Sequence, residues 1–166
     1  MEILDVVARW PGSTHDSFMW KRSKLRELFV SGQIPRQNFL LGDSGYPLEP
    51  WLLTPYSSPN THAQQIFNRK HKSLRAVVEH CNGLLKSRFR CLHESGGVLL
   101  YTPIKTCKII LACTVLHNIC IQRNIPWDNY EVEEDTVQPV NNDNSNNAWR
   151  REALLIRDEI AANMSR

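Results

Sequence analysis

Two acidic residues stand at places from which carboxylates can do chemistry together. Asp43 ends the apolar run Phe39-Leu40-Leu41, which breaks at once into a Gly and Pro turn. Glu79 follows as the only acid between residues 69 and 90. Mg²⁺ prefers carboxylate oxygens, and a pair of metal ions can neutralise a phosphate and activate a water. We therefore treat Asp43 and Glu79 as candidate ligands of Mg²⁺ or Mn²⁺ in a site that cuts phosphodiester bonds, with a third carboxylate that is not evident in this chain.

Each of these acids also has a simpler explanation. Asp43 precedes Ser44 and Gly45, and Asp-Ser-Gly is ordinary turn chemistry. Glu79 lies four residues after Arg75, a spacing at which an exposed helical ion pair contributes a few tenths of a kcal/mol. Neither residue is specific by itself.

The elements that must position these acids follow from local patterns. Apolar and β-branched runs predict strands, and apolar residues at helical spacing predict helices. Ser13 or Asp16 is a possible cap for the first helix. The predicted strands are 1–8, 39–43 and 51–54, and the predicted helices are 17–30, 61–89, 103–123 and 148–164.

The helix predicted for 61–89 carries an apolar stripe on one side and a basic stripe on the other. Such a stripe is typical of a face that contacts DNA phosphates, although a solvated helix face has the same composition. The candidate DNA-binding residues are Arg69, Lys70, Lys72, Arg75, Lys86, Arg88 and Arg90.

The helix predicted for 103–123 is apolar on most sides, so we expect it to be buried. Its apolar run is interrupted by polar residues and is shorter than the roughly 20 residues that cross a bilayer, which argues against a membrane protein. Cys113 and His117 have the spacing of zinc ligands, but no second ligand pair stands at finger spacing. We interpret them as core groups, with His117 and Asn118 satisfying a helix end or a neighbouring loop.

Charge is distributed unevenly along the chain. Residues 1–127 contain 16 Lys or Arg and 8 Asp or Glu, whereas residues 128–147 contain 6 acids and no Lys or Arg. A basic body favours an anionic partner. The acidic, Asn-rich stretch has the composition of a mobile linker. The five cysteines include no C-x-x-C pair, which favours free thiols in a reducing compartment.

An ordered set of short motifs resembles one known family. The set is Trp10-Pro11-Gly12-Ser13 with Asp16, Leu40-Leu41-Gly42-Asp43-Ser44, Trp51-Leu52 with Thr54-Pro55, Arg75 with Val78-Glu79, Gly83, Lys86 and Arg88-Phe89-Arg90-Cys91-Leu92, and Ile110-Leu111-Ala112-Cys113 with Val115-Leu116-His117-Asn118-Ile119. Together these motifs resemble the DDE endonuclease domain of Harbinger-type transposases and of the nucleases derived from them.

The resemblance implies an α/β fold, an RNase H-like mixed sheet flanked by helices, with its first two strands missing here. It places the family's second catalytic Asp on Asp43 and its catalytic Glu on Glu79. The resemblance implies an endonuclease domain at 1–122. Composition and helical spacing predict a linker at 123–147 and, at 148–166, an amphipathic helix that covers the body or binds a partner. Also implied are a divalent cation, a DNA substrate, a Myb-like protein partner, and a nuclear location with a cytoplasmic pool as the second expectation.

The sequence departs from the family in three places. The first catalytic Asp belongs to an Asp-Gly-x-His-like segment, which nothing before Asp5 supplies, and the family's helix-turn-helix is also missing. Asn82 stands where a Phe is usual. The resemblance assigns Asp5 to the third strand and Asp16 to a turn motif, so neither is expected to replace the missing acid. Two functions remain open: a metal-dependent DNA nuclease that is incomplete in this chain, or a catalytically inactive remnant that binds DNA or protein.

Overall fold

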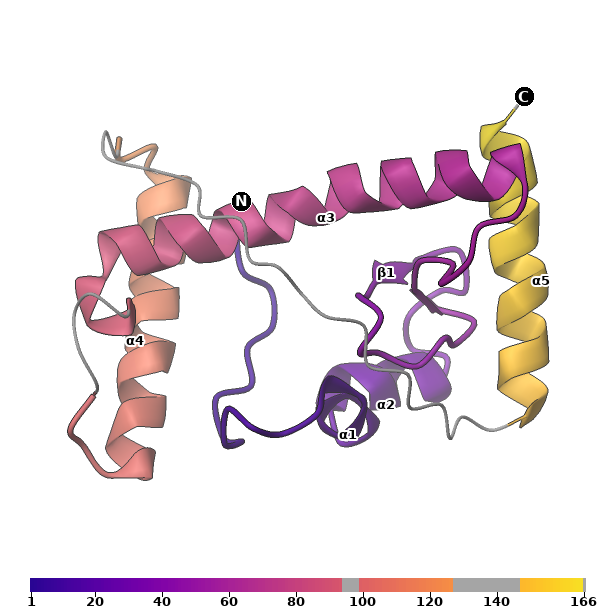
Figure 1. The fold of residues 1–166 in the computed structure, drawn as a ribbon. Coiled ribbons are helices and arrows are strands. Elements are labelled where there is room, and N and C mark those ends of the chain that lie inside the picture. Colours follow the sequence, from indigo (N-terminus) through magenta and orange to yellow (C-terminus); the bar gives the residue numbers. More distant parts are fainter. Residues whose placement is uncertain (94–98, 127–146, 166) are drawn as a thin grey trace. The chain divides into compact units, whose positions relative to one another are not determined.

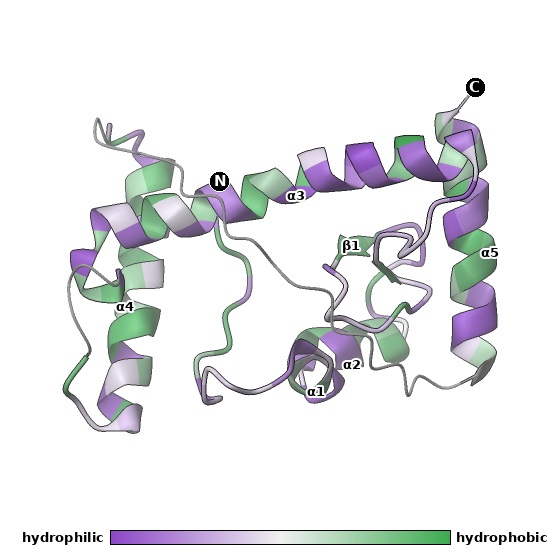
Figure 2. Ribbon diagram, viewed as in Figure 1, coloured by the Kyte–Doolittle hydropathy of each residue, from purple (hydrophilic) through white to green (hydrophobic). Residues whose placement is uncertain are grey.

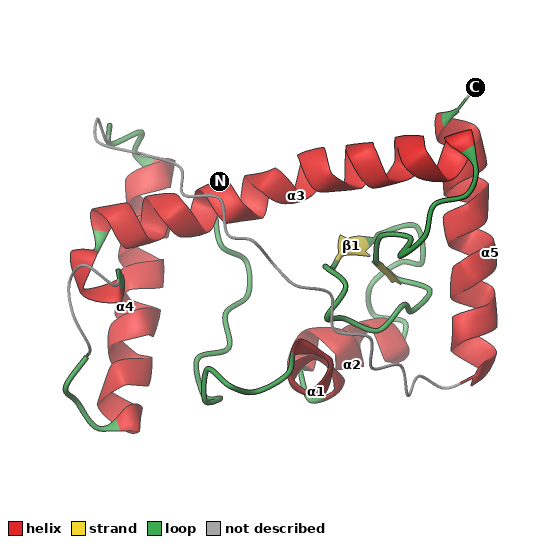
Figure 3. Cartoon of the chain, viewed as in Figure 1, coloured by secondary structure: helices red, strands yellow, loops and turns green. Residues whose placement is uncertain are grey.

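Helices make up most of the residues that the structure describes, and the strands are short (Figure 3). The computed structural model describes residues 1–93, 99–126 and 147–165. A helix-rich chain with a small parallel sheet is consistent with the predicted α/β class. The elements are α1 (Asp16–Lys21), α2 (Lys24–Val30), β1 (Leu40–Leu41), β2 (Leu52–Leu53), α3 (His62–Arg88), the 3₁₀ turn η1 (Arg90–Leu92), α4 (Pro103–Gln122) and α5 (Asn147–Met164) (Figure 1).

The chain divides into two compact units. The strand unit comprises Ser13–Arg75 and Val137–Arg166, and the α4 unit comprises Met1–Gly12 and Ala76–Thr136. Helix α3 begins in the strand unit and ends in the α4 unit.

The two strands of the strand unit form a parallel pair. Leu40 is in register with Leu52, and Leu41 with Leu53. The ladder continues one residue further, because the Gly42 N–H donates to the Leu53 carbonyl at 3.0 Å. The sequence predictions of strands at 39–43 and 51–54 are therefore confirmed. This pairing brings Asp43 to the carboxyl end of β1.

The predicted single helix over 17–30 is wrong, since the structure has two short helices there. Ser23 is the reason: its backbone is extended, and its hydroxyl accepts the Arg26 N–H at 3.1 Å as an N-cap. The predicted cap of the first helix is also wrong. His15 occupies that position without a side-chain hydrogen bond, and Asp16 is the first helical residue.

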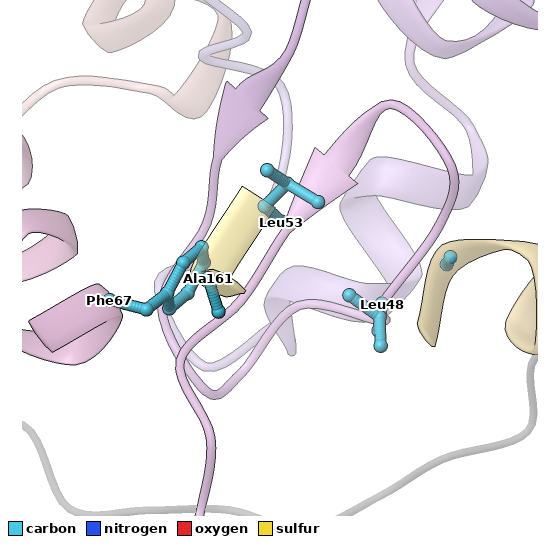
Figure 4. Close-up of a cluster of buried hydrophobic side chains, with 5 residues drawn as sticks. Leu48, Leu53, Phe67 and Ala161 are labelled. Carbon is cyan, nitrogen blue, oxygen red and sulfur yellow. The ribbon is translucent and has the colours of Figure 1, made fainter. Parts of the chain in front are cut away.

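Helix α5 covers the core of the strand unit. Ala153 (0% exposed) and Ala161 of α5 are buried in one apolar cluster with Leu48, Leu53 and Phe67 (Figure 4). The guanidinium of buried Arg157 donates to the carbonyl oxygens of Thr54, at 3.0 Å, and Pro55, at 3.3 Å. The predicted helix over 148–164 is thus confirmed, and it covers the body of its own chain.

Enlarging a buried alanine of α5 is expected to loosen this cover. Ala161→Leu inserts three carbons into a filled contact and should lower the free energy of unfolding by about 1–3 kcal/mol. Ala162→Leu is the matched control, because Ala162 is the next residue of α5 and is exposed. Urea denaturation compares the two variants. Equal stability of both would contradict the packing of α5 on the core.

The α4 unit holds the opening segment by side chains instead of by a sheet. The Asn118 amide accepts the Ile3 N–H at 2.9 Å and donates to the Ile3 carbonyl at 2.8 Å. Buried His117 lies 3.2 Å from the Met1 carbonyl, and its Nε2 lies 3.7 Å from the Cys81 Sγ. The prediction that His117 and Asn118 are packed groups serving a neighbouring loop is confirmed. The predicted strand at 1–8 is wrong for this structure, because a strand needs a pairing backbone edge and Asn118 supplies a side chain in its place.

Helix α4 begins at Pro103, after Thr102, as predicted, but it is not buried as predicted. Its apolar side chains include Ile104, which is 72% exposed, and Val115, which is 58% exposed. Figure 2 shows hydrophobic residues along much of this helix. The sequence argument that this run is too short to cross a bilayer is not supported, because α4 is 20 residues long and by length and composition alone could do so; a single such helix is weak evidence for a membrane span. His117 and Asn118 of this helix contact the opening segment at Met1 and Ile3. The predicted linker at 123–147 falls mostly on residues 127–146, outside the described residues.

Candidate functional site

Asp43 lies where β1 runs into a tight turn. Its Oδ1 accepts the Gly45 N–H at 2.8 Å, and its carbonyl accepts the Tyr46 N–H at 3.2 Å. The side chain is 18% exposed, so it is largely but not fully removed from solvent. The turn chemistry seen in the sequence is therefore real, and it holds the carboxylate in a fixed orientation at the strand end.

A second carboxylate lies beside Asp43. A Cβ added to Gly45 would lie 3.0 Å from Asp16 Oδ2 and 3.1 Å from Asp43 Oδ1. Both carboxylate oxygens thus lie close to the position that a Gly45 side chain would occupy, and a side chain at residue 45 would displace them. Asp16 was assigned to a turn motif and not to the site, although its place in the first of the family motifs was a signal in the sequence.

Arg75 is the cation of this group. Its Nη2 lies 3.6 Å from Asp43 Oδ2, and both side chains are about four-fifths buried. All of these residues belong to the strand unit: Asp16, Asp43, Gly45, Tyr46 and Arg75. We call Asp16, Asp43 and Arg75 the Asp43 cluster.

Negative charge dominates the Asp43 cluster. The pKa of Asp16 is raised, first by burial and then by the charge of Asp43, while Arg75 lowers it. The pKa of Tyr46 is raised to about 12, again by burial first and then by the charges of Asp16 and Asp43. Two carboxylates and one guanidinium carry a net charge of −1 when ionised, so the site favours an additional cation.

Glu79, the second candidate ligand, lies on α3 one turn after Arg75 and is exposed. It belongs to the α4 unit, and so does Asp5. Within one unit, the structure brings Asp43 together with Asp16 and Arg75 and not with Glu79.

The predicted basic residues are divided between the units. Arg69, Lys70, Lys72 and Arg75 lie in the strand unit, and Lys86, Arg88 and Arg90 lie in the α4 unit. Five of the seven are exposed. The other two are less exposed: Arg75 pairs with Asp43, and Arg88 Nη2 donates to the Ile125 carbonyl at 3.2 Å.

The side-chain oxygens of this site are of the type that binds a hard divalent cation. Asp16 and Asp43 offer carboxylate oxygens at one place, which Mg²⁺ and Mn²⁺ prefer. In the parts of the chain that the structure describes, no group of three or more His, Cys, Asp or Glu residues is placed to hold a metal. Water and substrate oxygens complete such sites, since Mg²⁺ retains several waters.

His71 ties α3 to the strands that carry Asp43. Its Nε2 lies 3.2 Å from the Leu53 carbonyl, and the ring also interacts with the carbonyl of Gly42, the residue before Asp43. Burial lowers the pKa of His71 below its usual value, and these two hydrogen bonds only partly oppose the shift. The fold therefore favours neutral His71.

Acidification is expected to weaken the strand unit through His71. A pKa that is lower in the folded than in the unfolded protein adds stability above about pH 6.5, and this stability is lost as the pH falls through the folded-state pKa. Urea midpoints should therefore fall from pH 7 to pH 5, and less so in His71→Gln, which cannot titrate. His62→Gln, at an exposed histidine of the same helix, should behave like the wild type. An identical pH dependence in His71→Gln and the wild type would refute this role.

The sequence of this chain matches a known protein family. The family model described as DDE superfamily endonuclease matches residues 1–118, which include Asp16, Asp43, Arg75 and Glu79. The chain belongs to the DDE superfamily endonuclease family. The resemblance seen in the motifs is thereby confirmed.

Individual proteins from animals and a plant are similar to this chain. The chain is 38% identical over 159 residues to "Putative nuclease HARBI1" of Rattus norvegicus, an alignment that covers 95% of this chain and 45% of the rat protein. The human protein of that name is 41% identical over 123 residues, covering 74% of this chain and 35% of its own length. "Protein ALP1-like" of Arabidopsis thaliana is 30% identical over 177 residues, covering 98% and 41%.

The chain spans less than half the length of these relatives. No solved structure matched the chain significantly.

Proposed function

We propose that this DDE-family chain is part of a metal-dependent DNA nuclease of transposase origin, in which Asp43 and Glu79 hold Mg²⁺ or Mn²⁺. The observation that carries the proposal is the position of Asp43: a largely buried carboxylate at a strand end, in a family of endonucleases, beside a second carboxylate. A bound divalent cation neutralises phosphate charge and lowers the pKa of an attacking water.

The residues of the chain have separate tasks in this proposal. The turn at Gly45 holds Asp43 Oδ1 and leaves Oδ2 directed at a cation, which is Arg75 in this structure. Exposed Glu79 is accessible to a substrate that approaches α3. The exposed basic residues of α3 and η1 bind the DNA backbone, so affinity should fall with salt concentration. An RNase H-like mixed sheet is the architecture that would unite Asp43 and Glu79.

The partners and location are part of the same proposal. DNA is the substrate, a Myb-like DNA-binding protein is the protein partner, and the nucleus is the site of action. The resemblance to Harbinger-type transposases supports all three.

The second candidate function is a DNA-binding or protein-binding module without catalysis. It is favoured by the absence of a three-ligand group among residues 1–93, 99–126 and 147–165. The test that separates the two functions is nicking of supercoiled plasmid DNA with Mn²⁺. Nicking by the wild-type chain that is lost when Asp43 is replaced supports the nuclease. Salt-sensitive DNA binding without nicking supports the module.

A further inference from the structure

The Arg75 guanidinium is close enough to Asp43 to repel a metal ion bound to that carboxylate. Its Nη2 is 3.6 Å from Asp43 Oδ2, the oxygen that is not held by the Gly45 N–H. The same guanidinium lowers the pKa of Asp16 and that of Tyr46, so its charge reaches every acidic group around Gly45. Arg75 is therefore the counter-ion of the whole Asp43 cluster.

A divalent cation and this guanidinium cannot both be neighbours of Asp43 Oδ2 without cost. Like charges a few ångströms apart repel, and partial burial reduces the screening by water. The separation of 3.6 Å exceeds the range of a hydrogen bond, so the attraction between Arg75 and Asp43 Oδ2 is mainly electrostatic, and a second cation at Oδ2 would weaken it.

We propose that Arg75 is a built-in counter-cation that competes with divalent metal for Asp43 and so sets the metal affinity of the site. This inference rests on the proposed function, because it takes Asp43 as a metal ligand. Arg75 is a positioning residue in this role: in the metal-free protein it neutralises and orients the carboxylate, and metal binding displaces it.

A comparison of arginines gives a sharp test. Arg75→Gln removes the competing charge and should tighten Mn²⁺ binding by about tenfold. Arg36→Gln is the matched control, since Arg36 is an exposed arginine of the same unit that pairs with Glu152 at 3.3 Å and lies outside the site. Its Mn²⁺ affinity should stay within about twofold of the wild type. Free Mn²⁺ is measured by electron paramagnetic resonance at one pH and one ionic strength.

Two further variants separate charge from shape. Arg75→Lys keeps the charge and should bind Mn²⁺ nearly as weakly as the wild type. Arg75→Met removes the charge at similar length and replaces the Gln variant if that protein unfolds, as judged by circular dichroism. Tighter binding by Gln and Met but not by Lys supports the proposal. Unchanged or weaker binding by a folded charge-removing variant overturns it.

Asp43→Asn distinguishes failure of the inference from failure of the proposed function. If this variant loses Mn²⁺ binding while Arg75→Gln leaves it unchanged, Asp43 is a ligand and only the role of Arg75 is refuted. If Asp43→Asn binds Mn²⁺ like the wild type, the metal site at Asp43 and the competition by Arg75 both fail.

Discussion

Replacing Asp43 by asparagine is expected to abolish Mn²⁺-dependent nicking of DNA, a loss on the order of 100-fold or more. A metal ion contributes several kcal/mol of charge stabilisation in the transition state, and about 1.4 kcal/mol corresponds to a tenfold change in rate. In the wild type the Gly45 N–H donates to Asp43 Oδ1 at 2.8 Å. Asparagine keeps an oxygen that can accept this hydrogen bond, so the turn should survive while the negative charge is lost. Glu79→Gln should cause a loss of similar size.

The control for these variants is Glu27→Gln. Glu27 is an exposed carboxylate of α2 whose partner is Lys24 at 2.8 Å, so its loss should leave nicking unchanged. All variants are purified in the same way, and plasmid nicking is followed at equal Mn²⁺ and salt concentrations. Undiminished nicking by both Asp43→Asn and Glu79→Gln would refute their assignment as metal ligands.

Replacing Glu49 by alanine is expected to lower the free energy of unfolding of the strand unit by about 3–5 kcal/mol. Glu49 is 2% exposed, and its carboxylate accepts the indole N–H groups of Trp20, at 2.9 Å, and Trp51, at 3.0 Å. Arg26 donates to the same carboxylate through Nε and Nη2, at 2.9–3.2 Å. Alanine would leave a partly buried guanidinium and two indole donors without their acceptor.

A double replacement tests this explanation. In Glu49→Met with Arg26→Met the unpaired guanidinium is removed as well, so the double variant should be more stable than Glu49→Met alone. Glu27→Ala is again the exposed comparison and should cost at most about 1 kcal/mol. Urea denaturation at pH 7 gives the free energy of unfolding of these four variants and of the wild type. A Glu49→Ala variant as stable as Glu27→Ala would show that the buried carboxylate is not needed.

Glu49 belongs to none of the motifs or stripes that the sequence shows. One signal was available, because Glu49 is the only charge in the mostly apolar stretch 46–55, and a charge within a buried run requires partners. Trp51 is a neighbour in sequence, but Trp20 and Arg26 stand 29 and 23 residues earlier in the chain, so no local pattern identifies these two partners. The break between α1 and α2 was not predicted for a different reason. Serine also occurs inside helices, and only the extended backbone of Ser23 in the structure shows that it caps α2.

Much of the local structure could be predicted from residue spacing. Hydrophobic periodicity gave the approximate bounds of α3, α4 and α5 and the two strands, and the ordered motifs gave the family, because both depend on residues close in sequence. The contacts between distant residues could not be predicted in this way: Asp16 lies beside Asp43 at Gly45, Arg75 pairs with Asp43, and Asn118 holds Ile3. The residues in these contacts are separated in the sequence by 27, 32 and 115 positions. Local patterns do not encode such contacts, because only folding brings these residues together.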